Sequence, residues 1–160
     1  MFFYLISIFH ECVKRIPKVK LLIVGEGELY EVMKNDLEEK GILDLVHFLG
    51  IRDNVNELMW AMDILLLPSF YEGLPLVLVE SQSASLMSLE STKITQLVNL
   101  TPFIAYLDIE DKDLNFWIDR IIDYGNNYLR DSSVKQLLTD KNFNIQVEAE
   151  RLSKIYLQNN

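Results

Sequence analysis

Short aliphatic runs alternate with longer amphipathic segments along most of the chain. The continuous apolar runs are typical of buried parallel strands and cover residues 19–25, 45–50, 63–69 and 103–109. Apolar positions at helical spacing predict helices over residues 2–16, 28–40, 54–61, 75–86 and 111–125. Strand, crossover helix and strand repeat in that order. The pattern therefore predicts an α/β fold, a doubly wound parallel sheet with helices on both faces.

Four residues mark the ends of the predicted helices. Pro17 stops the first helix, and Gly41 is expected to form the C-cap of the second. Asp53 is expected to cap the third helix, and Pro75 is well placed as the first residue of the fourth.

The pattern is weaker towards the C-terminus. Between Met87 and Thr101 there is no firm helical period and no glycine or proline, so the sequence assigns no element there. Residues 141–160 predict a closing helix that packs on one face. Its apolar residues at helical spacing are Val147, Leu152, Ile155 and Tyr156.

The first predicted helix is apolar on most of its faces over residues 2–9. It lacks the positive start and the small-residue cleavage site of a signal peptide. It is also shorter than the roughly 20 apolar residues that a membrane span needs. Such a helix is typical of a buried position and needs cover on several sides.

The composition excludes several classes of protein. The chain has 160 residues, 49% apolar and 24% charged, which is the balance of one globular domain, residues 1–160. Its 15 basic and 24 acidic residues give a formal net charge of −9, which disfavours general nucleic-acid binding. Cys12 is the single cysteine, so no internal disulfide can form and a reducing, cytoplasmic compartment is expected.

The candidate chemistry lies where the predicted strands end. Ligands of open parallel sheets bind beyond the carboxyl ends of the strands. Here those ends are followed by Gly25-Glu26-Gly27, by Gly50-Ile51-Arg52 and by residues 69–73. All three loops are expected on one side of the sheet.

The third loop leads into a helix flanked by two glutamates, Glu72 and Glu80. The amides of Gly73, Leu74 and Leu76 bracket the start of this helix, and its dipole favours an anion such as a diphosphate. Carboxylates beside that anion would bind hydroxyl groups, because a carboxylate accepts paired hydrogen bonds from a diol. The arrangement indicates a nucleotide-sugar site.

Simpler interpretations remain open for each feature. The helix dipole alone favours Glu72, and a glutamate within a helix such as Glu80 is commonly solvated. Gly25 and Gly27 lack a third glycine, since position 30 is tyrosine, which disfavours a dinucleotide site. With two histidines and one cysteine, no metal-ligand cluster is expected.

Taken together, these residues resemble the donor-binding, C-terminal half of the group 1 glycosyltransferases, retaining GT-B enzymes built from two Rossmann-like domains. The similarity runs from Leu21 to Ser85 and is carried by VGEGEL, by VHFLGIRDNVNELM and by the paired glutamates in PSFYEGLPLVLVE. The closing KNFNIQVEAERLSKIYL is also similar to the family's last helix.

The resemblance implies transfer of a hexose from a nucleoside-diphosphate sugar, with uridine as the expected base, in capsular or exopolysaccharide synthesis. It would place Glu72 on hydroxyls of the donor sugar and Glu80 on the ribose. Backbone groups of the Gly73–Leu76 segment would reach the sugar and diphosphate. Gly25 would belong to the first nucleotide-side loop, and Gly50 and Ile51 would lie beside the base. No metal or other cofactor is expected, because helix amides and protein cations neutralise the leaving group.

Two departures from the family limit these implications. Relative to it, the chain begins in the helix after the domain's first strand, and the acceptor-binding domain is not represented, so we expect an N-terminally truncated domain that does not transfer sugar alone. The stretch SLMSLESTKIT replaces the family's Gly-Leu-Pro turn and Ser-Asp pair. A separate chain carrying the acceptor domain is one expected partner, and the inner face of the membrane is one expected location. The alternatives are a non-catalytic nucleotide-sugar binding module and a non-functional remnant.

Overall fold

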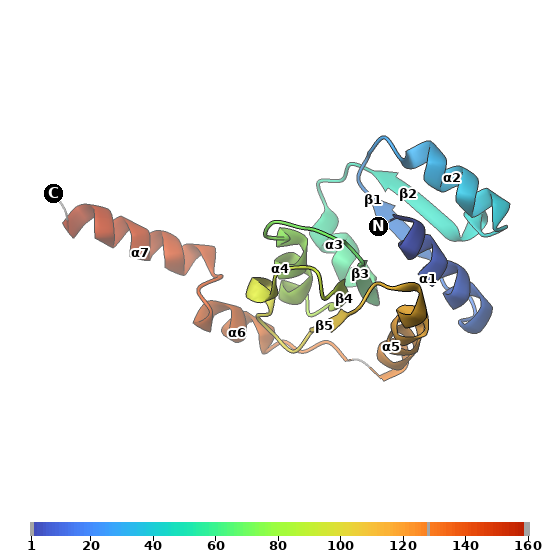
Figure 1. Ribbon diagram of the computed structural model, residues 1–160. Helices are drawn as coiled ribbons and strands as arrows, with labels where there is room; N and C mark the ends of the chain where they lie inside the picture. The colour runs from blue at the N-terminus through green and yellow to red at the C-terminus, as the bar shows by residue number, and fades with distance from the viewer. Residues whose placement is uncertain (1, 128, 159–160) are drawn as a thin grey trace.

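The computed structural model describes residues 2–127 and 129–158 (Figure 1). The helices are α1 (Phe2–Arg15), α2 (Tyr30–Glu39), α3 (Val55–Ala61), α4 (Leu76–Ser83), α5 (Leu114–Asn127), α6 (Val134–Asp140) and α7 (Ile145–Gln158). The strands are β1 (Leu21–Val24), β2 (Val46–Gly50), β3 (Ile64–Leu67), β4 (Met87–Ser91) and β5 (Ile104–Leu107). Short 3-10 helices cover η1 (Leu43–Leu45), η2 (Gln96–Val98) and η3 (Asp111–Asp113).

The strands form two parallel sheets. One contains β1 and β2, and the other has the order β3-β4-β5. In the second sheet Ile64 of β3 pairs with Met87 of β4, and Ser88 pairs with Ile104 of β5. The predicted α/β fold with parallel strands is confirmed, although the strands are divided between two sheets.

Helices cover both faces of the three-stranded sheet. On one face Leu89 of β4 packs with Trp117 and Ile118 of α5. On the other face α4 lies against β4, where the Ser81 and Ser88 hydroxyl oxygens are 2.7 Å apart. The central strand β4 is therefore buried along its whole length, as expected for a strand enclosed by helices.

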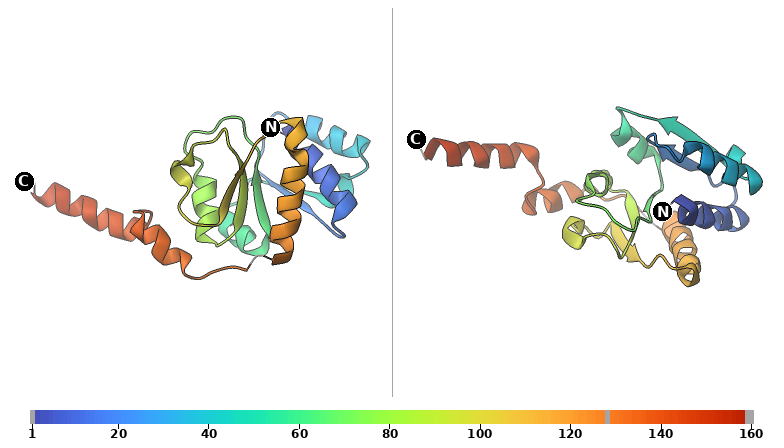
Figure 2. Two further views of the ribbon diagram at one scale, coloured as in Figure 1. Left: turned by 60° about the horizontal axis from the view of Figure 1, so that its bottom comes forward. Right: turned by 45° about the horizontal axis from the view of Figure 1, so that its top comes forward.

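The apolar helix α1 connects the two sheets. Its residues Ile8 and Cys12 belong to the core of the three-stranded sheet, whereas Ile6 and Phe9 pack on the core of β1 and β2. Figure 2 shows α1 lying between α2 and α5, both of which it contacts. The expected cover on several sides is confirmed. Within the described residues, none of the helices is both long and apolar enough to cross a bilayer.

Strand β4 lies in the stretch 87–101, to which the sequence assigned no element and in which the departure from the family pattern put a strand in doubt. The turn before it is made by Ser85, whose φ of 51° is in the left-handed region that glycine favours. The Ser85 hydroxyl donates a hydrogen bond of 2.6 Å to the carbonyl oxygen of Asp131. A strand can therefore start at Met87 without the glycine and proline that were expected to introduce it.

Two helix starts also differ from the prediction. The N-cap of α3 is Asn54 rather than Asp53, and its side chain makes no capping hydrogen bond to the helix. Pro75 is the N-cap of α4, with extended backbone, so the helix begins one residue later at Leu76. The C-cap of α2 is Lys40, and Gly41 follows it with a φ of 67°, the left-handed position after a helix that glycine favours.

The C-terminal helices differ more from expectation. Helix α6 was not predicted, and it packs through Val134 and Leu138 against Leu100 and Phe103. Helix α7 extends away from the rest of the molecule (Figure 1). The prediction that it packs on one face is wrong, because the four residues expected to form that face are all exposed: Val147, Leu152, Ile155 and Tyr156.

Candidate functional site

The ends of β1 and β2 are held together by their glycines. The Gly25 amide donates a hydrogen bond of 2.8 Å to the Gly50 carbonyl oxygen. Their φ angles are 116° and 63°, values that strain any residue with a Cβ. Ile51, next along the chain, is exposed. The structure thus brings together Gly25, Gly50 and Ile51, three of the residues that the sequence assigned to a nucleotide-side surface.

The N-terminus of α4 is open to solvent. Gly73, Leu74 and Leu76 are exposed around the buried Pro75. Proline has no amide hydrogen, and the N-cap provides no side-chain hydrogen bond to the helix. The amides of the first turn are therefore not capped by a side chain of the N-cap residue. Such a helix start can accept an anion.

Glu72 is oriented by a neighbouring serine. The buried Ser69 hydroxyl donates a hydrogen bond of 2.8 Å to Glu72 Oε1, and the glutamate is half-buried. Its carboxylate is thus fixed by a specific partner as well as favoured by the helix dipole.

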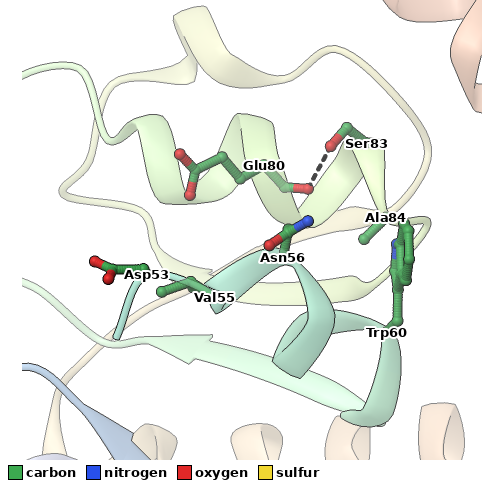
Figure 3. Close-up of a pocket in the computed structure, with 7 residues that line it drawn as sticks. All are labelled: Asp53, Val55, Asn56, Trp60, Glu80, Ser83 and Ala84. Carbon is green, nitrogen blue, oxygen red and sulfur yellow. Dashed lines mark hydrogen bonds between the residues drawn. The ribbon is translucent and has the colours of Figure 1, made fainter. Parts of the chain in front are cut away.

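Glu80 lines a cavity of about 470 Å³ between α3 and α4. Figure 3 shows the Glu80 carboxylate and Asp53 towards one end of the cavity and Trp60 towards the other. The charged side chains lining it are both acidic. The lining residues are Asp53, Val55, Asn56, Trp60, Glu80, Ser83 and Ala84.

The predicted site residues fall into two groups. Gly25, Gly50 and Ile51 lie at the ends of the two-stranded sheet, whereas the others lie at the start of α4 or, for Glu80, within it. Glu72 does not line the cavity that Glu80 lines. The two glutamates therefore lie on different surfaces around the same helix. The second group contains Glu72, Gly73, Leu74, Leu76 and Glu80.

Asp53, Asn56 and Trp60 were not recognised as site residues from the sequence. Asp53 was assigned to a helix cap instead. Trp60 is 65% exposed although tryptophan is usually well buried. Met59 faces the core, so the next residue, Trp60, lies off the buried face of α3. A tryptophan directly after a core position was the signal that could have identified it as a site residue.

Glu90 is a further unusual residue near the carboxyl end of β4. Its side chain is fully buried, and neither carboxyl oxygen has a hydrogen-bond partner within the described part of the chain. Burial raises its pKa to about 7, while the nearby Tyr106 hydroxyl acts in the opposite direction. Glu90 pairs in register with Leu67 and Tyr106. Because sequence patterns do not show which polar residues are buried, this carboxyl was missed.

The described residues contain no group of three or more histidine, cysteine, aspartate and glutamate side chains that could hold a metal ion. Cys12 is buried, and burial raises the pKa of its thiol to about 11. This thiol therefore stays protonated near neutral pH and is a poor nucleophile.

The sequence is similar to proteins whose names give them as glycosyltransferases. It is 37% identical over 82 residues to EpsF of Bacillus subtilis (strain 168), a protein named as a glycosyltransferase, covering 51% of this chain and 21% of EpsF. It is 35% identical over 72 residues to an Escherichia coli enzyme named UDP-Gal:alpha-D-GlcNAc-diphosphoundecaprenol alpha-1,3-galactosyltransferase, covering 44% of this chain and 19% of the enzyme. The chain thus spans about a fifth of the length of these curated relatives.

The fold is similar to halves of larger solved structures. Sucrose-phosphate synthase from Thermosynechococcus elongatus matches with a TM-score of 0.74 at 20% identity, over 96% of this chain and 41% of the synthase. Anabaena Alr3699/HepE, solved in complex with UDP, matches with a TM-score of 0.68 at 22% identity, over 93% of this chain and 44% of HepE.

The family described as glycosyl transferases group 1 matches residues 2–92, more than half of the chain. This match includes the glycines at the ends of β1 and β2 and both glutamates beside α4. The chain therefore belongs to the group 1 glycosyl transferases, and it has the C-terminal, Rossmann-like fold of their GT-B architecture.

Proposed function

We propose that the chain binds a nucleoside-diphosphate sugar, most simply a UDP-sugar, at the carboxyl ends of its strands. The Glu80 carboxylate accepts hydrogen bonds from the ribose hydroxyls, and Glu72 accepts them from the sugar. The diphosphate lies at the start of α4 near Gly73, Leu74 and Leu76. The base lies beside the backbone of Gly50 and Ile51, next to the Gly25 turn.

One observation carries this proposal: Glu80 lines a cavity on the same helix whose N-terminus has no side-chain cap. The first-turn amides offer a site for phosphate, and the carboxylate offers an acceptor for hydroxyls one to two turns along. A nucleoside-diphosphate sugar carries both groups in one molecule. The cavity of about 470 Å³ lies within the usual range for small-ligand sites.

The relatives support the same ligand class. Alr3699/HepE was solved with UDP and also with UDP and glucose, and the E. coli relative is named for a UDP-galactose donor. The reaction we propose for the complete enzyme is hexosyl transfer with retention, in the synthesis of a capsular or other polysaccharide. Neutralisation of the diphosphate by helix amides would require no metal ion.

We expect this chain alone to bind the donor without transferring sugar. The helix amides hold the diphosphate, but the charged residues that line the neighbouring cavity, Asp53 and Glu80, are both acidic and add no positive charge to help it leave. An acceptor domain would have to complete the enzyme, and we propose a cytoplasmic location or the inner face of the membrane. A non-catalytic binding module is therefore the second candidate function.

Calorimetric titration of the purified chain with UDP, UDP-glucose and UDP-galactose tests the proposal. Replacing Glu80 by alanine should weaken UDP binding by about tenfold or more, because the charge-assisted hydrogen bonds to the ribose contribute on the order of 1.5–3 kcal/mol. Replacing Glu39, an exposed glutamate on α2, is the matched control and should leave the dissociation constant unchanged.

The outcomes separate the candidate functions. Binding that Glu80→Ala weakens, without release of free sugar or UDP over hours, supports a donor-binding module. Turnover in the presence of an acceptor-domain chain supports a divided enzyme. A chain that melts cooperatively but binds none of the three nucleotides would contradict the proposed site and leave a folded remnant.

A further inference from the structure

Arg130 lies in the irregular connection between α5 and α6, and its side chain contacts both helices that line the cavity. Its Nη1 donates a hydrogen bond of 2.6 Å to the Ala84 carbonyl oxygen at the end of α4. Its Nη2 donates hydrogen bonds of 2.8 Å and 2.6 Å to the carbonyl oxygens of Met59 and Met62 at the end of α3. One guanidinium group therefore joins the C-terminal ends of two helices that are distant from it in sequence.

The contact suits the chemistry of the groups that make it. The last four carbonyl groups of an α-helix have no partner within the helix. A guanidinium group carries five N–H donors in a fixed plane and stays charged, so it can bind carbonyl oxygens of both helices at once. The helix dipole also favours a positive charge at a helix C-terminus. Arg130 thus acts as a shared C-terminal cap of α3 and α4.

The backbone next to Arg130 is fixed as well. The Ser85 hydroxyl, in the turn after α4, donates a hydrogen bond of 2.6 Å to the Asp131 carbonyl oxygen. The Asp131 carboxylate accepts hydrogen bonds of 2.8 Å and 2.7 Å from the amide and the hydroxyl of Ser133. These contacts hold the connection against the end of α4, so the place of the guanidinium does not depend on its own flexible stem alone.

The two joined helix ends form one end of the cavity. Ala84 lines the cavity and also provides a carbonyl oxygen to Arg130. Figure 3 shows Trp60, which follows Met59 in the chain, at the same end as Ala84. Of the seven residues of α3, Met59 alone is buried, so this helix has little other anchorage. The separation of α3 and α4 at this end therefore depends on Arg130.

Arg130 is too far along α4 to contact the diphosphate itself. The proposed phosphate position is at the N-terminus of this eight-residue helix, about 12 Å from the C-terminus that Arg130 binds. Because Arg130 is exposed, its replacement leaves no hole in a core. An effect of this residue on ligand binding must then pass through the two helices.

We propose that Arg130 is a positioning residue for the donor site, an inference that rests on the function proposed above. By joining the ends of α3 and α4, it sets the width of the cavity and so the place of the Glu80 carboxylate relative to α3. The ribose is bound in this cavity. Its contacts weaken when the two walls shift by a fraction of an ångström, because the polar groups of a binding site act only within a narrow range of geometry.

Replacing Arg130 should weaken binding of UDP without removing any group that touches it. In calorimetric titration, Arg130→Gln should raise the dissociation constant by about fivefold. Arg130→Lys should have a similar effect although it keeps the charge, because one ammonium group cannot bridge the carbonyl oxygens of two helices. Arg120→Gln is the matched control, since Arg120 is exposed on α5, across the sheet from α4. It should change the dissociation constant by less than about twofold, because salt screens a distant exposed charge.

A double-mutant cycle separates positioning from a general loss of structure. In a Glu80→Ala background, Arg130→Gln should weaken UDP binding by less than about twofold, because the contact that Arg130 positions is already gone. A general loss of structure would instead weaken binding by the same factor in both backgrounds.

Hydrogen exchange measures the same role without a ligand. The Met62 amide donates a hydrogen bond of 3.0 Å to the Leu58 carbonyl oxygen at the end of α3. It should exchange faster in Arg130→Gln than in the unmodified chain. The Ile42 amide, bonded to the Leu37 carbonyl oxygen after α2, is the internal reference and should exchange at the same rate in both.

Each contrary result has a distinct meaning. Unchanged UDP binding by Arg130→Gln would contradict the role of Arg130 and leave the donor site intact. Equal weakening in the two backgrounds would make Arg130 a structural residue only. An unchanged Met62 amide would show that α3 keeps its place without Arg130. If the unmodified chain binds no UDP, the donor site itself is contradicted, and this is seen before any variant is compared.

Discussion

Replacing Gln82 by leucine is expected to lower the free energy of unfolding by about 3–5 kcal/mol. Gln82 is fully buried on α4. Its Nε2 donates hydrogen bonds of 2.8 Å to the carbonyl oxygens of Leu78 and Val98. Its Oε1 accepts from the Leu100 amide and from both the amide and hydroxyl of Thr101. Leucine has similar size but would leave these partners without their bonds in a buried environment.

The expected loss of stability comes from the connection between β4 and β5. One glutamine side chain joins helix α4 to the segment 98–101, which otherwise has only the short η2 helix as regular structure. Each buried amide or hydroxyl left unsatisfied costs about 1–3 kcal/mol, and three such donors converge on Gln82 Oε1. Because Glu80 lies two residues before Gln82, loosening this contact should also weaken donor binding at the cavity.

Urea denaturation followed by circular dichroism measures the effect. Gln136→Leu is the matched control, because Gln136 is exposed on α6 and its side chain donates a hydrogen bond to the exposed Asp140. It should change stability by less than about 0.5 kcal/mol. Equal stability losses in the two variants would show that the buried network does not hold the β4–β5 connection.

The sequence was sufficient to predict the elements whose apolar residues are continuous or strictly periodic. The strands over residues 64–67 and 104–107, for example, lie inside the predicted runs. Strand β4 was not predicted because its polar residues Ser88, Glu90 and Ser91 are all buried, which the sequence pattern does not show. The Ser88 hydroxyl meets Ser81 across the contact between α4 and β4. Such a pairing between two elements exists only after the chain has folded.

The two C-terminal helices were mispredicted for different reasons. Helix α6 had a usable signal, Val134 and Leu138 four residues apart, but the segment is short and follows an irregular connection. Helix α7 has the amphipathic pattern of a packed helix, yet its apolar face meets no core in the described chain. Periodicity predicts which face of a helix is apolar, and it carries no information about the partner that covers this face.

In the candidate site too, residues with a local signal were predicted, and residues that join the site through packing of distant elements were not. Gly25 and Gly50 were recognised as strand-ending residues, and their hydrogen bond confirms that the two ends meet. Glu80 was identified from its place beside a helix start. The cavity that it lines depends on α3 packing against α4, so Asp53 and Trp60 joined the site only in three dimensions.

The stability of the chain is expected to fall as the pH rises from about 4.5 to about 7, through the buried carboxyl of Glu90. Its pKa in the folded chain is about 7, whereas its ordinary value is 4.5. Below pH 4.5 the group is protonated in both states. Between the two values the folded chain keeps a proton that the unfolded chain releases, so rising pH favours unfolding. The shift corresponds to a loss of about 3 kcal/mol that is complete above pH 7.

Glu90→Gln isolates this contribution, because glutamine is close in shape to the protonated glutamate and cannot ionise. The variant should be more stable than the unmodified chain at pH 8 and similar to it at pH 5. Asp131, whose pKa is lowered by hydrogen bonds from Ser133, contributes a pH dependence of opposite sign, but it is common to both proteins and cancels in their difference. Glu39→Gln on the surface of α2 is the control. If the two glutamine variants follow the same stability curve from pH 5 to pH 8, Glu90 is ionised in the folded chain. That result would contradict the raised pKa and the burial of this carboxyl in β4.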